Sequence, residues 1–328
     1  MPSSDLPLDL LACPRCAGAL RPGLRCAGCG AEYGEEGGIA SLRVPSDART
    51  EAVRAFYARA PFPAYPPRDT FSWLRARASR SELARALDRS IPGNARILEV
   101  GCGTGQMSLF LATADRTVVG ADLCRPSLEL AEAARRRYGI GRARFVETDL
   151  RSPGLRRGAF DVVYSSGVLH HTPDPRASFA AIARLARPGG MVVVGLYNAC
   201  ARLPHRLRRL VARLSGFRFF LGDPVLRERR KEPARRNAWL LDQYRHVEEH
   251  RHTLGEVQGW FRENRVDYLR SHPGTLLGGG PLPEDGLFEE AEDDWGFENA
   301  LAQLRWMRTL SHEGGLFVVI GRAGASPA

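Results

Sequence analysis

The sequence predicts an α/β protein built around a parallel sheet, with a small metal-binding module in front of it. From Ala95 onward, short apolar runs rich in β-branched residues alternate with helical stretches, as successive βαβ units require. A glycine-rich turn follows the first of these runs, which is typical of a ligand-binding strand–helix junction. Residues 13–30 hold four of the seven cysteines as two CxxC pairs, which is the spacing of a zinc site.

Composition narrows the range of functions. The chain has 328 residues and a formal net charge of +10 that comes almost entirely from arginine, since Lys231 is the only lysine. This charge is compatible with an acidic ligand or a nucleic acid. The N-terminus lacks the basic and apolar segments of a signal peptide, and no apolar run is long enough to span a bilayer. We therefore expect a cytoplasmic protein, and paired cysteines in that reducing compartment are metal ligands rather than disulfides.

We expect the chain to divide into four parts. These are a zinc-ribbon module (1–45), an aromatic and proline-rich connector with a helical cap (46–93), an α/β domain with insertions at 199–253 and 274–312 (94–322), and a disordered tail (323–328). The first part is too short to fold on apolar burial alone, so it needs a metal ion.

The α/β domain is expected to contain seven strands. Five follow in sequence at 95–100, 116–123, 143–150, 160–168 and 191–197, with helices beginning at Gln106 and spanning 126–139 and 176–190. A helix at 254–264 precedes a strand at 266–272, and a helix at 298–310 precedes the last strand at 316–322. The two late strands are expected to complete the sheet after a long insertion.

The segment EVGCGTG, residues 99–105, is the expected ligand-binding loop. Its glycines allow close approach to a ligand, and Glu99 suits a ligand with an ammonium group and would repel a pyrophosphate. Asp122 closes the second strand, where a carboxylate accepts hydrogen bonds from ribose hydroxyls. Asp149, after the third strand, is placed to accept a hydrogen bond from the amino group of adenine.

Five motifs in register resemble class I S-adenosylmethionine-dependent methyltransferases of types 11 and 12. They are ILEVGCGTG, VVGADL, ETDL, FDVVYSSGVLHH and LARPGGMVVVGLYN, between residues 95 and 200. The resemblance implies a Rossmann-like, doubly wound seven-stranded sheet with a reversed last strand, and a methyltransferase activity. It also implies that S-adenosylmethionine contacts Glu99, Gly101, Cys102, Gly103, Gly105, Gln106, Asp122, Leu123, Thr148, Asp149, Leu150, Ser165 and Ser166.

Three residues are expected near the methyl acceptor. His170 and His171 follow the fourth strand, and Tyr197 ends the fifth, all at the carboxyl edge of the sheet. Either histidine could act as a general base if the acceptor loses a proton, or could simply pack. The VLHHTPDP segment resembles methyltransferases that act on small molecules. An Asn/Asp-Pro-Pro-aromatic sequence is absent, which argues against methylation of exocyclic base amines but not against other RNA sites.

The connector and the long insertion supply further candidates. Aromatic residues of the connector could close over a sulfonium by cation–π contact, or could pack as an ordinary linker. Histidines near 250 are expected to line the substrate pocket, because their pattern is not HExxH and favours no second metal site. The expected lid and substrate residues are Tyr57, Phe62, Tyr65, Asn198, His246 and His250.

The stretch from Leu203 to Leu214 predicts a basic amphipathic helix. Its leucines share one face, and its arginines could meet RNA, an anionic membrane surface or an acidic substrate. The simpler alternative is a solvated face whose charge is balanced by the acidic segment 284–298.

The zinc ligands are expected to be Cys13, Cys16, Cys26 and Cys29. This module resembles the small zinc-binding subunit that activates RNA and protein methyltransferases, and also the ribbon fused to an rRNA guanine methyltransferase family. The module carries few basic residues, which disfavours binding of nucleic-acid phosphates by the module itself.

The hypothesis favoured by the sequence is methyl transfer from S-adenosylmethionine to a small-molecule metabolite or natural product, with a structural zinc ion. The alternative is an rRNA or tRNA methyltransferase that binds RNA with the ribbon and the arginine-rich insertion. A fold retained only for cofactor-dependent interaction is the third possibility, and the intact motif set disfavours it. The sequence indicates no particular oligomeric state.

Overall fold

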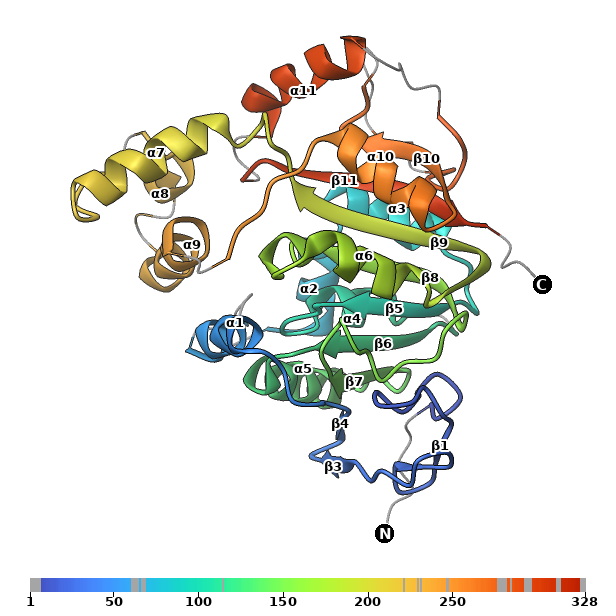
Figure 1. The fold of residues 1–328 in the computed structure, drawn as a ribbon. Helices are drawn as coiled ribbons and strands as arrows, with labels where there is room; N and C mark the ends of the chain where they lie inside the picture. The colour runs from blue at the N-terminus through green and yellow to red at the C-terminus, as the bar shows by residue number, and fades with distance from the viewer. Residues whose placement is uncertain are drawn as a thin grey trace.

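The computed structural model shows an α/β protein whose helices cover both faces of a central sheet (Figure 1). The structure describes residues 7–59, 65, 69–113, 115–220, 222–228, 230, 232–245, 248–275, 282–283, 285–291, 297–310 and 314–324. Two expected site residues, Phe62 and His246, lie outside the described residues, as does the end of the expected tail, 325–328. The rest of that tail is ordered here, because Ala323 still pairs with Val266 in the sheet.

The sheet has nine strands in the order β10-β11-β9-β8-β5-β6-β7-β4-β3. Seven are the expected strands: β5 (Arg96–Val100), β6 (Thr117–Asp122), β7 (Ala143–Glu147), β8 (Phe160–Ser166), β9 (Ala186–Tyr197), β10 (Val266–His272) and β11 (Leu316–Ala323). Strand β11 is antiparallel to both of its neighbours, whereas β5 to β9 pair in parallel. The reversed last strand is thereby confirmed.

The other two strands come from the N-terminal module. Strand β4 (Ile39–Ser41) pairs in parallel with β7, and β3 (Gly34–Glu36) pairs with β4 at the edge. The main chain continues this pairing, since the Leu42 amide donates to the Glu147 carbonyl at 2.8 Å and the Leu42 side chain is fully buried. A separate two-stranded hairpin, β1 (Leu20–Arg21) with β2 (Arg25–Cys26), completes the module. The module is therefore joined to the sheet rather than separate from it.

Helices cover the sheet on two faces. One face packs against α6 (Pro175–Ala183), α10 (Leu254–Glu263) and α11 (Phe297–Thr309). The other packs against α2 (Phe71–Ala78), α3 (Glu82–Ser90), α4 (Gln106–Leu111) and α5 (Arg125–Tyr138). The side chains of alternate strand residues pack in the cores on the two faces of the sheet. For example, Ile97 packs on one face and Leu98 on the other.

Helix α6 is shorter than the sequence predicts. It ends at Ala183 instead of continuing to residue 190, and β9 begins at Ala186. The extra pairing of Phe160 with Ala186 brings the strands together early, and a Cβ at Gly190 would lie 3.0 Å from the Phe160 carbonyl oxygen. The Pro-Gly-Gly sequence therefore lies in the strand rather than in the helix.

Three helices of the insertion and one of the connector lie together beside the sheet (Figure 1). They are α1 (Ala48–Arg59), α7 (Leu203–Leu214), α8 (Pro224–Glu228) and α9 (Pro233–Arg245). The bidentate ion pair between Arg49 of α1 and Glu248, with its shortest N–O distance of 2.7 Å, ties the connector to the end of the insertion. Among the described residues, no helix is both long and apolar enough to cross a bilayer.

Candidate active site

A cavity of about 620 Å³ lies at the carboxyl ends of the parallel strands. This is where open α/β sheets bind their ligands. Most of the residues expected to bind the cofactor line this cavity. They are Glu99, Gly101, Cys102, Gly103, Gln106, Asp122, Leu123, Thr148, Asp149, Leu150 and Ser166. Gly105 and Ser165 do not line it; Ser165 is fully buried and Gly105 is the N-cap of α4.

The glycine loop owes its path to two close packing contacts. Gly101 has φ +71°, and a Cβ there would lie 2.2 Å from a Val168 methyl carbon. Gly105 has φ +73°, and a Cβ would lie 2.7 Å from the Phe145 ring. Only glycine meets both conditions without strain, so the loop stays close to the ends of β5 and β6.

Two carboxylates near the carboxyl ends of neighbouring strands line the cavity. Glu99 is 7% exposed, and burial raises its pKa to about 7 although Ser108 donates a hydrogen bond to it. Asp122 accepts hydrogen bonds from the Gly103 and Cys124 amides, both at 2.8 Å, and burial raises its pKa. A ligand with a positive charge or with hydroxyl donors would stabilise the charged forms of these two buried carboxylates.

The third expected carboxylate, Asp149, is already engaged by protein donors. Ser46 donates to it at 3.0 Å, and Arg151 donates both from its amide and from its guanidinium, at 2.9 Å in each case. Burial raises the pKa of Asp149, but Arg151 outweighs this effect and holds the pKa below its usual value. An adenine amino group would therefore share these oxygens with Ser46 or Arg151.

His171 is the histidine that reaches the cavity. Its Nδ1 lies 2.7 Å from the Glu248 carbonyl oxygen, and burial lowers its pKa to about 4. Because a carbonyl can only accept, Nδ1 carries the proton and Nε2 is the basic nitrogen of the neutral ring. His170 does not line the cavity and instead stacks on the Tyr197 ring at a centroid distance of 3.9 Å. The geometry thus separates the two histidines into one at the cavity and one that packs.

Tyr197 lines the same end of the cavity and is held by the insertion. Its hydroxyl accepts a hydrogen bond from Gln243 at 2.6 Å, and the Arg202 guanidinium lies 4.0 Å from its ring centroid. Arg202 is fully buried and pairs with Glu249 at 2.8 Å. Sequence reasoning missed Arg202 and Gln243, because only tertiary contacts bring these two residues of the insertion to Tyr197. Gln243 lies two residues before the end of α9, and a polar residue near the end of a helix gives no signal of its own.

The expected lid and substrate residues are divided by the structure. Tyr57 of α1 lines the cavity, whereas the Tyr65 hydroxyl donates to the Thr104 carbonyl at 2.7 Å and stays behind the glycine loop. Asn198 was expected to face substrate, but it is buried and its amide oxygen caps the turn at Cys200 instead. His250 does not line the cavity either, because its ring turns toward Glu248, with Nε2 2.9 Å from the carboxylate.

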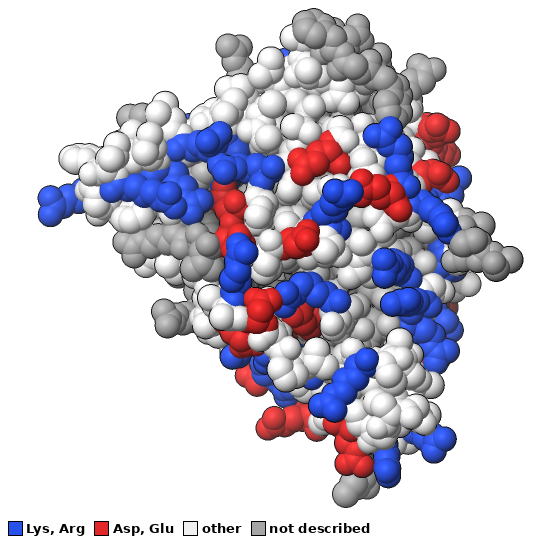
Figure 2. All heavy atoms as spheres, viewed as in Figure 1, with Lys and Arg blue, Asp and Glu red and all other residues white. Residues whose placement is uncertain are grey.

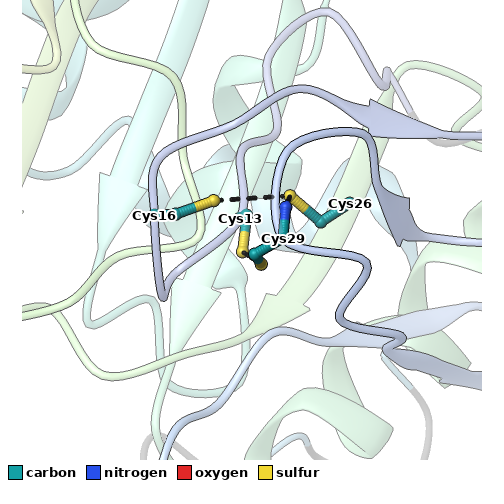
Figure 3. Close-up of side chains that lie close together, drawn as sticks. All are labelled: Cys13, Cys16, Cys26 and Cys29. Carbon is teal, nitrogen blue, oxygen red and sulfur yellow. Dashed lines mark hydrogen bonds between the residues drawn. The ribbon is translucent and has the colours of Figure 1, made fainter.

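The four cysteines of the N-terminal module converge on one point (Figure 3). Their Sγ atoms lie within 4.8 Å of one another, with Cys13 and Cys29 3.6 Å apart and Cys16 and Cys26 3.4 Å apart. A zinc ion bound tetrahedrally at about 2.3 Å separates neighbouring sulfurs by roughly 3.8 Å, so the cluster fits such an ion. Backbone amides of Gly28 and Cys29 point at the Cys26 sulfur, as is common for metal thiolates.

Comparison with known proteins identifies the central domain. Residues 98–194 match the family model described as a methyltransferase domain. An uncharacterized protein from Synechococcus sp. is 28% identical over 268 residues, which cover 71% of this chain and 64% of that protein. A ubiquinone biosynthesis O-methyltransferase from Bordetella bronchiseptica is 37% identical over 109 residues, which cover 31% of this chain and 43% of that enzyme.

Magnesium protoporphyrin IX methyltransferase from Synechocystis, with bound SAH, aligns with a TM-score of 0.48 at 14% identity, covering 84% of this chain and all of that one. The match to this chain spans less than two thirds of either curated relative. Residues 98–194 are thus similar to a methyltransferase domain, and they include many of the residues that line the cavity.

Proposed function

We propose that this protein transfers a methyl group from S-adenosylmethionine to a small-molecule acceptor. The observation that supports it most strongly is one cavity that joins two kinds of residue. Glu99, near the end of β5, and Asp122, at the end of β6, line the same cavity as His171 and Tyr197. A cofactor held by the first pair would present its reactive end to an acceptor held by the second.

The residues of the first pair fit the cofactor's groups. Glu99 matches an ammonium group, and the outer lone pairs of Asp122 can accept from ribose hydroxyls while Gly103 and Cys124 hold the carboxylate in place. When bound, S-adenosylmethionine supplies an electrophilic methyl group on a sulfonium sulfur. The chain's part in an in-line displacement is to orient the two reactants and to exclude water.

His171 and Tyr197 are the residues we propose to act on the acceptor. His171 is neutral at physiological pH, so its Nε2 can accept a hydrogen bond from an acceptor O–H or N–H and take its proton during transfer. The Tyr197 hydroxyl accepts from Gln243, which fixes the position of this residue in the cavity wall beside the proposed acceptor. His170 supports the Tyr197 ring and is assigned a positioning role.

A small molecule is the favoured acceptor. The cavity volume lies within the range of small-molecule sites. The O-methyltransferase from Bordetella, matched over the central domain, carries a name that refers to ubiquinone biosynthesis, which supports this class. An RNA clamp would need the ribbon and the arginine-rich insertion on one side, whereas they lie at opposite ends of the molecule (Figure 1).

The ribbon is proposed to hold one structural zinc ion. Four cysteines complete a tetrahedral shell and leave no open position for substrate, so the ion would stabilise the fold rather than act on the acceptor. By stabilising the ribbon, the zinc ion would keep β4 paired with β7. The chain that follows β4 would then place Ser46 where it donates to Asp149.

Asp122→Ala should weaken binding of S-adenosylhomocysteine by about 10- to 100-fold, because charge-assisted hydrogen bonds to the ligand are lost. Isothermal calorimetry measures this directly. The matched control is Asp267→Ala, an exposed position on β10 that should leave affinity unchanged. Equal affinities for wild type and Asp122→Ala would remove the ribose assignment.

Affinity for S-adenosylhomocysteine should rise with pH between 5.5 and 7.5. Glu99 has its pKa raised to about 7 in the free protein, and the cofactor's ammonium group favours the charged form, so binding releases a proton. Below pH 7 the affinity should therefore increase by up to about tenfold per pH unit. In Glu99→Gln this dependence should be lost; a slope as steep as that of the wild type would assign the proton to another group.

Replacing Cys13 and Cys16 together by serine should reduce bound zinc from about one ion per chain to below a tenth, as measured by plasma mass spectrometry. Limited proteolysis should then cut the N-terminal 45 residues faster than in the wild type. Cys200→Ser is the matched control, since Cys200 lies outside the cluster. Full zinc content in the double variant would refute this site.

A further inference from the structure

Helix α7 carries an apolar stripe that is exposed over much of its length. Nine large hydrophobic side chains of the described chain are exposed, and five of them lie on α7 or just after it: Leu203, Leu207, Leu210, Leu214 and Phe219. The four leucines recur at intervals of four, three and four residues, so they share one side of the helix. Leu214 is 80% exposed and Leu207 is 57% exposed.

The opposite side of α7 is the one that packs on the protein. Ala212 is fully buried, and the buried His205 has its Nε2 2.9 Å from the Gln243 carbonyl oxygen of α9. On a helix these two residues lie about half a turn from the leucine stripe. The stripe therefore faces directly away from the body of the protein.

Arginines border the stripe. Arg206 and Arg213 are exposed on α7, and Arg218 is exposed in the turn that follows it. The nearby acids are already engaged: Glu249 pairs with Arg202 and Arg209, and Glu248 pairs with Arg49. Basic side chains accordingly gather over the end of the molecule where α7 lies (Figure 2).

The acidic segment expected to balance this charge lies elsewhere. Of its described part, the Glu289 carbonyl accepts from Arg270 of β10 at 2.8 Å, and the Leu287 amide donates to Ser90 of α3 at 3.2 Å. Residues 284 and 292–296 are outside the described chain. These contacts of the segment are thus made with β10 and α3 rather than with α7.

We propose that α7 docks on an anionic lipid bilayer. The leucine stripe would enter the boundary between headgroups and acyl chains, and Arg206, Arg213 and Arg218 would pair with lipid phosphates. The apolar stripe is complementary to the acyl chains of such a bilayer, and the arginines that border it are complementary to the lipid phosphates. RNA would match the arginines but would leave the leucines in water, so it matches half of the feature.

Docking here would place the bilayer against a helix whose opposite side supports the cavity wall. Gln243 lines the cavity, and α7 contacts it through His205 and through the buried Arg202 that precedes the helix. The docking surface and the cavity wall therefore share one supporting residue. The proposal does not depend on methyl transfer, so its test uses binding alone.

The test is co-sedimentation of the full-length protein with vesicles. Wild type should bind vesicles of phosphatidylglycerol and phosphatidylcholine at 50 mM salt, bind pure phosphatidylcholine at least tenfold more weakly, and be released at 500 mM salt. Leu207→Ser/Leu214→Ser should lower the affinity for anionic vesicles at least tenfold. Arg206→Gln/Arg213→Gln should lower it by roughly fivefold per arginine removed.

The matched controls are Leu130→Ser on α5 and the exposed Arg157→Gln, which should bind like the wild type. Circular dichroism should show that every variant is folded, since all the changed side chains are exposed. Equal binding by wild type and the leucine variant would overturn the proposal. The proposal would also be overturned if the wild type formed a dimer that does not bind vesicles and that dissociates in Leu207→Ser/Leu214→Ser, because a second copy would then cover the stripe. Binding of the wild type to RNA but not to vesicles would overturn it as well.

Discussion

The parallel pairing of β5, β6 and β7 is the constraint on which the site depends. It sets Val100 opposite Ala121 and Asp122 opposite Glu147, so the residues that leave the three strands emerge at one edge of the sheet. Glu99, Asp122 and Asp149 thus reach one cavity although about fifty residues of chain separate the first from the last. Gly101 and Gly105 then keep the loop against the strand ends, which buries two carboxylates and raises their pKa values. Two buried carboxylates suit a ligand that brings positive charge and hydroxyl donors, because such a ligand stabilises their charged forms.

The segments outside the seven-stranded sheet complete this site from two sides. From the ribbon, β4 extends the sheet at β7, and the chain that follows places Ser46 on Asp149 and α1 over the cavity. From the insertion, α9 contributes Gln243, and the buried Arg202 braces Tyr197. The ion pair of Arg49 with Glu248 joins the two sides. The cysteine-rich module thus contributes indirectly: its strand extends the sheet beside β7, and the chain that leaves it supplies Ser46 to Asp149 and α1 to the wall of the cavity.

Much of the fold and of the cofactor end could be predicted from the sequence, because both depend on local signals. Buried parallel strands appear as continuous apolar runs, and the residues that end them, such as Asp122, are fixed by the strand length. The acceptor end depends on tertiary contacts instead. Nothing in the sequence distinguishes His171 from His170, because only the Glu248 carbonyl and the Tyr197 ring separate their roles. Asn198 was expected at the cavity because it ends a strand, but a buried turn uses its side chain. The joining of β4 to β7 was also missed, since edge pairing of a three-residue strand carries almost no sequence signal.

The measurement that tests the central claim most directly is a label-partition assay. The protein would be incubated with methyl-labelled S-adenosylmethionine and an extract of the source cells, and the products separated into small-molecule, RNA and protein fractions. The account predicts label in the small-molecule fraction, an at least hundredfold lower rate with His171→Asn, and unchanged S-adenosylhomocysteine binding by that variant. Label found only in nuclease-sensitive RNA would contradict the proposed acceptor, and no transfer to any fraction by a protein that binds the cofactor would contradict the proposed activity.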